Sequence, residues 1–309
     1  MSKTKIAILG ATGHIAKNII MGLSKNTNYE LFLFARNQER LQAFLKAEIA
    51  DCSGIAVHSF SSFMELNYDA IMNCVGIGDP AKLKKVGGDI FRLTEEFDNL
   101  ALRYIENSPK TLYINFSSGI AYGSNFNTPA DQNKTAVINI NNISSTDYYT
   151  ISKMNTEAKH RSFSKFNIVD LRVFGFFSRY IDLKMPYFLS EIVNSLKRDK
   201  EFVTGSNDMV RDYIHPRDLV ELIERCINIR NINDVFDVYS LEPISKFQML
   251  EFFEKNYGLR VKIEKETEIT SVTGLKSNYY SLNRKSDMIG YQPQYSSKDA
   301  IISELNYIL

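Results

Sequence analysis

Two residues one helical turn apart carry the first chemical signal in this sequence. Tyr149 and Lys153 lie in a segment of helical length, and their four-residue spacing places both side chains on one helix face. An ammonium beside a phenol favours loss of the phenol proton, so the pair is suited to acid–base chemistry. Tyr148 competes for this role, but the residue four positions later is Ser152, which offers no cation. Taken alone, such a pair is also typical of a solvated helix surface.

Hydroxyl side chains follow a strand-like segment upstream of that pair. The apolar run Leu112–Phe116 leads directly into Ser117 and Ser118. Open parallel sheets bind ligands at the carboxyl ends of their strands, so these hydroxyls lie where a substrate is expected. The order of serine, tyrosine and lysine along the chain therefore favours a catalytic group over a chance surface pair.

A glycine-containing turn near the N-terminus predicts a dinucleotide site. The strand-like run Ile6–Leu9 enters Gly10-Ala11-Thr12-Gly13-His14-Ile15-Ala16, and a helical segment follows. Glycines in this turn permit a tight bend and close approach of backbone N–H groups to a pyrophosphate. The cofactor-binding candidates of this turn are Gly10, Thr12, Gly13, His14 and Ile15. An ordinary tight turn is the alternative, and for His14 a solvent-facing position is the preferred interpretation.

The end of the second predicted strand indicates which dinucleotide binds. Leu31–Ala35 is followed by Arg36 and Asn37, with Arg40 about one helical turn later. A carboxylate at this point would favour NAD, whereas an arginine pairs with a 2′-phosphate. We therefore expect Arg36, Asn37 and Arg40 to contact the cofactor and favour NADP(H) over NAD(H). Two solvated surface arginines are the alternative.

The elements that position these residues alternate between strand-sized and helix-sized segments, which predicts an α/β, Rossmann-type doubly wound parallel sheet. Expected strands are 5–9, 31–35, 55–60, 70–75, 112–117 and 168–174, and expected helices are 15–24, 40–48, 90–107 and 148–166. Residues 123–147 read as a long loop, and the pattern after 174 is irregular. We expect a cofactor-binding domain over 1–172 with a returning segment at about 215–240. A smaller substrate-binding domain is expected over about 173–214 and 241–309.

The amino-acid composition limits the kinds of partner that the protein is expected to bind. The 309 residues carry 37 Lys and Arg against 36 Asp and Glu, so no basic excess points to nucleic acid or a membrane surface. Three scattered cysteines and the lack of a long apolar run favour a soluble, cytoplasmic protein. The four histidines are too dispersed to predict a metal site, and His58 and His160 are expected to be incidental.

With these segments in order, the chain resembles the extended short-chain dehydrogenase/reductases, the NAD-dependent epimerase/dehydratase family that acts on nucleotide sugars. Ser152 and Glu157 complete the family's Tyr-x-x-Ser-Lys-x-x-x-Glu pattern around Tyr149 and Lys153. Further similar segments are Asn99 in 97–100, Leu171-Arg172-Val173-Phe174, Arg211-Asp212-Tyr213-Ile214-His215 with Asp218, and Gly290-Tyr291-Gln292-Pro293. The resemblance covers essentially the whole chain.

The resemblance assigns roles to single residues. It implies that Ser118 is the catalytic hydroxyl beside Tyr149 and Lys153, and that Arg211 grips the substrate diphosphate. It places Gly119 and Arg179 among the substrate-binding candidates. Cys74, Val75, Gly76, Asn99, Tyr149 and Lys153 join the cofactor-binding candidates. It also implies a homodimer formed through the helices expected at 90–107 and 148–166.

Departures from the family pattern narrow the expected activity. Gly119 and Ile120 stand where 4,6-dehydratases carry an Asp-Glu pair, which argues against dehydration, and Gly175 replaces a substrate-contacting asparagine. Because Arg36 favours NADPH as a consumed reductant, we expect a reductase of a nucleoside-diphosphate keto sugar. The expected substrate is a 4-keto sugar, 6-deoxy forms included. The alternatives are a nucleotide-sugar 4-epimerase with tightly bound NAD and, more remotely, a non-catalytic dinucleotide-sensing regulator.

Overall fold

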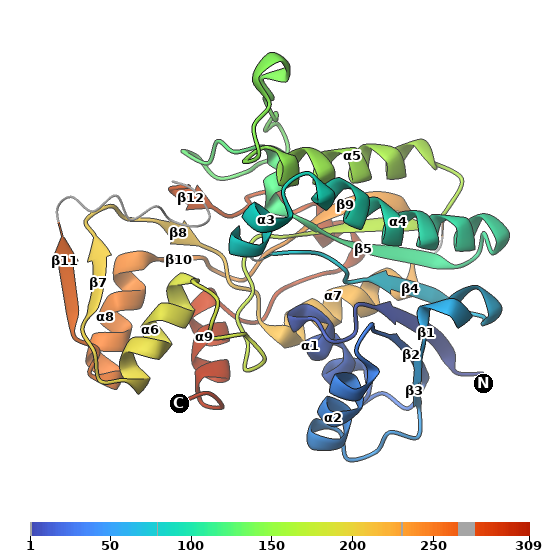
Figure 1. The fold of residues 1–309 in the computed structure, drawn as a ribbon, viewed down its shortest axis with the longest axis horizontal. Helices are drawn as coiled ribbons and strands as arrows, with labels where there is room; N and C mark the ends of the chain where they lie inside the picture. Colours follow the sequence, from blue (N-terminus) through green and yellow to red (C-terminus); the bar gives the residue numbers. More distant parts are fainter. Residues whose placement is uncertain (1, 79, 230, 265–275) are drawn as a thin grey trace.

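A seven-stranded parallel sheet forms the larger part of the molecule (Figure 1). The computed structural model describes residues 2–78, 80–229, 231–264 and 276–309. The sheet order is β3-β2-β1-β4-β5-β6-β9. Its strands are β1 Thr4–Leu9, β2 Tyr29–Phe34, β3 Ile55–His58, β4 Ala70–Asn73, β5 Leu112–Ser118, β6 Ile168–Val173 and β9 Asn233–Val238. The α/β, Rossmann-type class expected from the sequence is confirmed.

Helices cover both faces of this sheet because alternate strand residues point to opposite sides. In β1, Ile6 and Ile8 pack with residues of α1, α2 and α7, whereas Ala7 and Leu9 pack with residues of α4. The helices on the first face are α1 His14–Leu23, α2 Gln38–Glu48 and α7 Pro216–Asn228. The other face carries α4 Asp89–Asn107 and α5 Tyr148–Ser162, and α3 Pro80–Val86 precedes α4.

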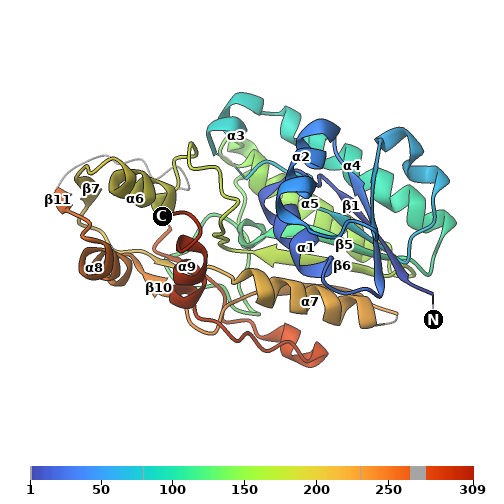
Figure 2. The same cartoon turned by 90° about the horizontal axis from the view of Figure 1, so that it is seen from below.

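The chain leaves the large sheet after β6 and returns to it at β9, building a smaller part on the way and after the return (Figures 1 and 2). This part holds two small sheets, ordered β10-β8-β12 and β11-β7. Its elements are α6 Phe188–Lys197, β7 Phe202–Gly205, β8 Val210–Arg211, β10 Ile244–Ser245, α8 Lys246–Tyr257, β11 Val261–Glu264, β12 Asn278–Tyr279 and α9 Ser297–Leu305. The sequence pattern predicted none of its helices.

Element boundaries differ from expectation where aromatic turns intervene. The helix expected to reach Phe166 ends at Ser162, because Phe163 and Phe166 form a turn in which the Phe166 N–H donates to the Phe163 carbonyl at 2.9 Å. The long loop between β5 and α5 contains only short 3₁₀ turns, at Gly119–Tyr122 and Ile140–Asn142. In the part of the chain that the structure describes, no helix is long and apolar enough to cross a membrane.

A buried chain of charged groups ties α4 and α5 to the sheet. His160 lies between two carboxylates, with Nε2 2.7 Å from Asp98 Oδ1 and Nδ1 2.9 Å from Asp170 Oδ1. Lys159 pairs with Asp98 at 2.6 Å, and Arg161 with Asp170 at 2.9 Å. Burial lowers the pKa of His160, but the two carboxylates outweigh it and raise the pKa to about 9. The expectation that His160 is incidental is therefore wrong.

Candidate active site

The candidate catalytic serine stands at the carboxyl end of β5. The two serines there serve different partners, since Ser117 donates to the Glu157 carboxylate while Ser118 begins the following 3₁₀ turn. Ser118 Oγ accepts from the Ile120 N–H at 3.4 Å and lies 3.1 Å from the phenol oxygen of Tyr279. Ser118 is thus the hydroxyl left for chemistry at this strand end.

The start of α5 brings the tyrosine and the lysine to the same strand. Lys153 is 6% exposed, and its Nζ donates to the Phe116 carbonyl of β5 at 2.9 Å. The same Nζ lies 5.9 Å from the centre of the Tyr149 ring. Tyr148 instead faces α4, where its ring lies 5.7 Å from that of Phe91. The structure therefore brings Tyr149, not Tyr148, together with the ammonium.

The turn after β1 has the shape that a pyrophosphate needs. Gly10 has a φ of +75°, and a Cβ there would stand 3.1 Å from the Cys74 backbone. Gly13 is the N-cap of α1, with no side-chain cap and no acidic residue in the first turn. The N–H groups of His14 and Ile15 therefore lie in the first turn of a ten-residue helix, and no acidic side chain in that turn neutralises its positive end. This backbone fits the dinucleotide that the sequence predicts.

His14 is not the solvent-facing turn residue that we expected. Its Nε2 lies 2.7 Å from Ser178 Oγ, and its ring packs against Phe176 at 5.1 Å. Burial, aided by the charge of Lys17, lowers the pKa of His14 to about 4, so the imidazole is neutral at pH 7. The side chain links α1 to the segment that follows β6, so the backbone N–H is the part of His14 left for a pyrophosphate.

The ends of β2 and β4 hold the other cofactor candidates. Arg36 and Arg40 are exposed, and among the described residues neither guanidinium makes an ion pair or hydrogen bond. Asn37 is occupied as the N-cap of α2, where its side chain accepts from the Arg40 N–H at 2.8 Å. After β4, burial raises the pKa of the Cys74 thiol, which excludes a reactive thiolate there. Val75 donates to Asn73 Oδ1, and Gly76 leaves open space beside the turn.

Two cations lie on the substrate side without an acidic partner in the described ranges. Arg211 is 8% exposed, and its Nη1 donates to the carbonyls of Val210 at 2.8 Å and Lys276 at 2.6 Å. The Lys276 ammonium lies 4.5 Å from the centre of the Tyr279 ring. Burial, and then the charge of Arg211, lower the pKa of Lys276 to about 8. A buried guanidinium and a half-buried ammonium that find no carboxylate among the described residues are suited to a bound anion.

Two of the candidate site residues, Arg179 and Asn99, have side chains that contact other parts of the protein. The Arg179 guanidinium grips Glu304 through Nε at 2.9 Å and Nη2 at 2.8 Å, and it stacks on Tyr307. Glu304 fills the fork of this guanidinium, which argues against the predicted contact of Arg179 with the substrate. Asn99 is exposed on α4, with its Oδ1 accepting from Lys159 at 2.9 Å, away from the strand ends. This contact argues against the predicted role of Asn99 at the cofactor.

Close packing explains why positions 119 and 175 are occupied by glycine. A Cβ on Gly119 would stand 2.4 Å from the Phe174 ring, and one on Gly175 would stand 2.5 Å from the Asp212 carbonyl oxygen. No asparagine fits at position 175 while the backbone of β6's extension pairs with Ile214, whose N–H donates to the Gly175 carbonyl. The departure from the family pattern thus has a steric cause.

Tyr279 and Lys276 are site residues that the sequence analysis missed. Both arrive with β12, which pairs with β8 so that Tyr279 lies opposite Arg211. Neither belongs to a motif, and only the long-range pairing of β8 with β12 brings them to the serine. No local signal in the sequence identifies them.

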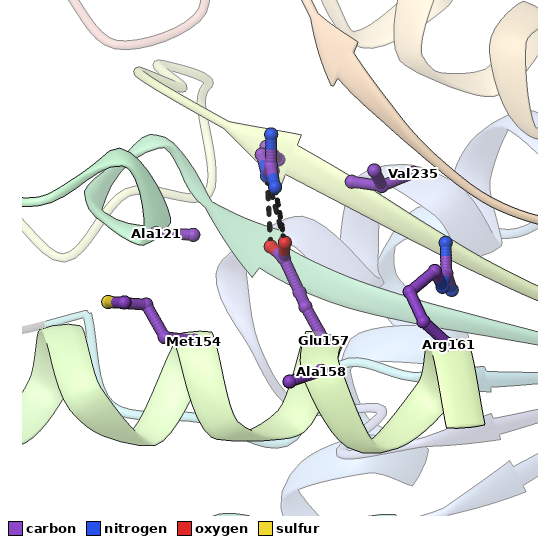
Figure 3. A pocket seen from close by; sticks show the side chains of 7 residues that line it. Ala121, Met154, Glu157, Ala158, Arg161 and Val235 are labelled. Carbon is purple, nitrogen blue, oxygen red and sulfur yellow. Dashed lines mark hydrogen bonds and ion pairs between the residues drawn. The ribbon is translucent and has the colours of Figure 1, made fainter. Parts of the chain in front are cut away.

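A hollow of about 260 Å³ between α5, β6 and β9 lies apart from the candidate site residues (Figure 3). Glu157 and Arg161 extend into it from α5, and Val235 borders it on β9. The Glu157 carboxylate is held by Arg172 of β6, with Nε 3.0 Å from both oxygens. None of the candidate catalytic or cofactor residues lines this hollow, so it is not the candidate active site.

Comparison with known proteins gives one family. A family model described as the NAD dependent epimerase/dehydratase family matches residues 6–239. No curated protein sequence matches the chain.

Solved structures of the same fold include three of particular interest. A UDP-glucuronic acid 4-epimerase from Bacillus cereus, in complex with UDP-glucuronic acid and NAD, is 17% identical with a TM-score of 0.79, covering 99% of each chain. A UDP-glucose-4-epimerase from Stenotrophomonas maltophila with bound NAD is 12% identical with a TM-score of 0.81, over 99% of this chain and 98% of the other. A dTDP-glucose 4,6-dehydratase from Bacillus anthracis in complex with NAD is 13% identical with a TM-score of 0.78, over 98% and 96%.

Proposed function

The chain belongs to the NAD-dependent epimerase/dehydratase family, and from that premise we propose that it is an NAD(P)-dependent enzyme that modifies the sugar of a nucleotide sugar. The observation that carries the proposal is the meeting of Ser118, Tyr149 and Lys153 at the end of β5. A sensor that only binds a dinucleotide has no need for this arrangement.

The proposed chemistry is a proton transfer by Tyr149 coupled to hydride transfer at a sugar carbon. A nicotinamide, when bound, supplies or accepts the hydride. The Tyr149 phenol gives a proton to the developing alkoxide, or takes one from a sugar hydroxyl in the reverse direction. Ser118 donates a hydrogen bond to the same oxygen. Lys153, fixed by the Phe116 carbonyl, supplies a positive charge 5.9 Å from the centre of the Tyr149 ring.

Arg211 is the proposed anchor of the substrate diphosphate. Its buried guanidinium has no carboxylate partner among the described residues, and its like-charged neighbour Lys276 reinforces the attraction for an anion. A guanidinium binds phosphate oxygens in a fixed fork geometry, which orients the sugar. Arg179, occupied by Glu304, has no part in this proposal.

The overall reaction that we favour is epimerisation at C4 of the sugar. Two of the three structures described above are 4-epimerases of UDP-sugars. In such a reaction the hydride returns to the sugar, so the cofactor is not consumed. Tyr149 and Ser118 serve both half-reactions, and Gly119 and Ile120 provide no acid or base for eliminating water. Epimerisation thus replaces the reduction that Arg36 alone favoured.

Reduction of a nucleoside-diphosphate keto sugar by NADPH is the second candidate. The observation that favours it is that Arg36 and Arg40 after β2 are exposed and find no partner among the residues that the structure describes. No carboxylate follows β2 in the sequence to bind the ribose of NAD. These guanidiniums suit the 2′-phosphate of NADP(H).

The test is the identity of the bound cofactor together with a substrate panel. Purified protein is denatured, its released dinucleotide is identified, and UDP- and dTDP-sugars with either C4 configuration are offered alongside 4-keto sugars with NADPH or NADH. Bound dinucleotide with interconversion of C4 epimers supports epimerisation. Stoichiometric NADPH oxidation by a keto sugar supports reduction instead. Neither activity, with a Tyr149→Phe variant unchanged in dinucleotide binding, supports a non-catalytic regulator.

A further inference from the structure

A second phenol stands beside the candidate catalytic serine. The Tyr279 hydroxyl oxygen lies 3.1 Å from Ser118 Oγ, and its ring packs against Phe126 at 4.7 Å and Phe174 at 5.2 Å. It reaches the site from β12 in the smaller part of the molecule, whereas Ser118 comes from the large sheet. The contact therefore joins the two parts at the reacting position.

The backbone around Tyr279 holds the phenol in place. The Asn278 N–H donates to the Phe126 carbonyl at 2.8 Å, and the Tyr280 carbonyl accepts from the Ala130 N–H at 2.9 Å. On its other side β12 pairs in parallel with β8, with Tyr279 opposite Arg211. Residues on both sides of Tyr279 are thus fixed, which leaves its hydroxyl little freedom to leave Ser118.

Counting hydrogen bonds at Ser118 shows what this contact does. A serine hydroxyl has one proton to donate and two lone pairs to accept with. The Ile120 N–H already points at the oxygen from 3.4 Å. A phenol is a stronger acid than an aliphatic alcohol, so Tyr279 is the better donor of the pair. Burial raises the pKa of Tyr279 and outweighs the lowering by the hydrogen bond with Ser118, so the phenol keeps its proton.

We propose that Tyr279 is a positioning residue that donates to Ser118 and leaves the Ser118 proton only one direction, toward the reacting oxygen of the substrate. With both lone pairs of Ser118 engaged, its hydroxyl acts as a donor in every turnover. The inference rests on the proposed function for the identity of the reaction, and it applies equally to epimerisation and reduction because both use the Ser118 proton. Tyr279 itself does not touch the substrate in this account.

A double-mutant cycle tests whether Tyr279 acts through Ser118. Tyr279→Phe removes one oxygen and keeps the ring that packs on Phe126 and Phe174. Steady-state kinetics are measured for wild type, Tyr279→Phe, Ser118→Ala and the double variant, in whichever reaction the wild type catalyses. Tyr280→Phe is the matched control, one residue along the same strand end, and the thermal unfolding midpoint of each variant reports folding.

The expected result is a loss of kcat of about tenfold in Tyr279→Phe with KM nearly unchanged, which is the size of one hydrogen bond. In the Ser118→Ala background the same change is expected to have no further effect. An equal tenfold loss in both backgrounds would show a role independent of Ser118 and overturn the inference. So would a rise in kcat or a large fall in KM, because these indicate that the phenol obstructs the sugar.

The same set of variants separates this inference from the proposed function. A Tyr149→Phe variant that abolishes turnover, with Tyr279→Phe as active as wild type, supports the proposed chemistry and refutes the role of Tyr279. A Tyr149→Phe variant that retains full turnover refutes the proposed chemistry. The coupling between positions 279 and 118 is then still read from the cycle, since it is measured on whatever reaction occurs.

Discussion

Two buried charged regions of this molecule differ in how their charges are balanced. Between α4 and α5, each buried charge meets an opposite one, as in the chain from Lys159 through Asp98, His160 and Asp170 to Arg161. At the ends of β5 and β8, the described residues offer Lys153, Arg211 and Lys276 only carbonyl oxygens and aromatic rings.

The difference separates stability from ligand binding. A balanced buried network holds helices to a sheet and is strongly destabilised when one member is removed. Cations without carboxylates stabilise nothing by themselves, and they reduce stability until an anion arrives. Thus the near-neutral chain, with 37 basic and 36 acidic residues, is balanced overall but not at the site, and the local imbalance indicates an anionic ligand.

The largest expected effect is a loss of enzymatic activity from a change at the ends of β5 and β8. Tyr149→Phe removes the proposed proton carrier, so we expect kcat to fall by about a thousandfold with unchanged folding stability. Initial rates on the substrate that the wild type accepts measure the loss. Tyr148→Phe, whose ring faces Phe91, is the matched control and should stay within about twofold of wild type. Equal losses in both variants would remove the distinction between the two tyrosines.

The next effect is on stability in the balanced region. His160→Gln leaves Asp98 and Asp170 without their shared cation, and we expect the free energy of unfolding to fall by about 3 kcal/mol. Urea unfolding measures it, and His58→Gln, outside the network, is the control. Because the pKa of His160 is raised from 6.5 to about 9, its contribution is full below pH 6.5 and is lost as the pH rises through about 9. A wild-type protein that does not lose stability over that interval relative to His160→Gln would contradict the account.

Lys276 should show the opposite pH dependence. Its pKa is lowered from 10.5 to about 8, so its charge opposes folding fully below pH 8, and the opposition disappears between about pH 8 and 10.5. We expect Lys276→Met to raise the free energy of unfolding by about 2 kcal/mol at pH 7, with the gain fading above pH 8. Urea unfolding at pH 7 and pH 10 measures this. Lys110→Met, at an exposed position, should change little, and a destabilised Lys276→Met would show that the charge is compensated.

The smallest effect concerns cofactor choice. Arg36→Ala is expected to weaken binding of NADPH about tenfold and leave that of NADH within about twofold, because only the 2′-phosphate loses a partner. Titration of cofactor fluorescence measures both, with Arg198→Ala as the control on the far part of the molecule. Equal weakening for both cofactors would assign Arg36 to general structure and withdraw support from NADP(H).

Local patterns in the sequence predicted the large sheet but not the smaller part. Six of its seven strands begin as short apolar runs that periodicity detects. The seventh, β9, carries Asn233, Asp234 and Asp237 in six residues, so it was expected only as part of a returning segment. Helices α8 and α9 also carried a local signal, since Ser245 with Gln248 and Ser296 with Asp299 form capping boxes. Short irregular connections on either side concealed them. Helices that pack mainly on each other need tertiary contacts to define them.

At the site, adjacency in sequence decided what could be predicted. Tyr149 and Lys153 share one helix, and the Gly10–Gly13 turn is a local motif, so both could be found by spacing. The pairing of Arg179 with Glu304 could not be foreseen, because Glu304 lies far along the chain. Tyr279 depends on the β8–β12 pairing for the same reason. The sequence identifies functional residues that lie together on one helix or turn. The structure is needed where a site is formed by two segments that are distant in the sequence.

Calorimetric titration with a nucleoside-diphosphate sugar tests most directly whether Lys153, Arg211 and Lys276 form an anion-binding site. UDP- and dTDP-sugars are titrated into wild type, Arg211→Met and His160→Gln at low salt. We expect about one site per chain in wild type and His160→Gln, and affinity lowered at least about tenfold in Arg211→Met. Equal affinity in Arg211→Met and wild type, or no binding to wild type, would contradict the assignment of this region to a nucleotide-sugar diphosphate.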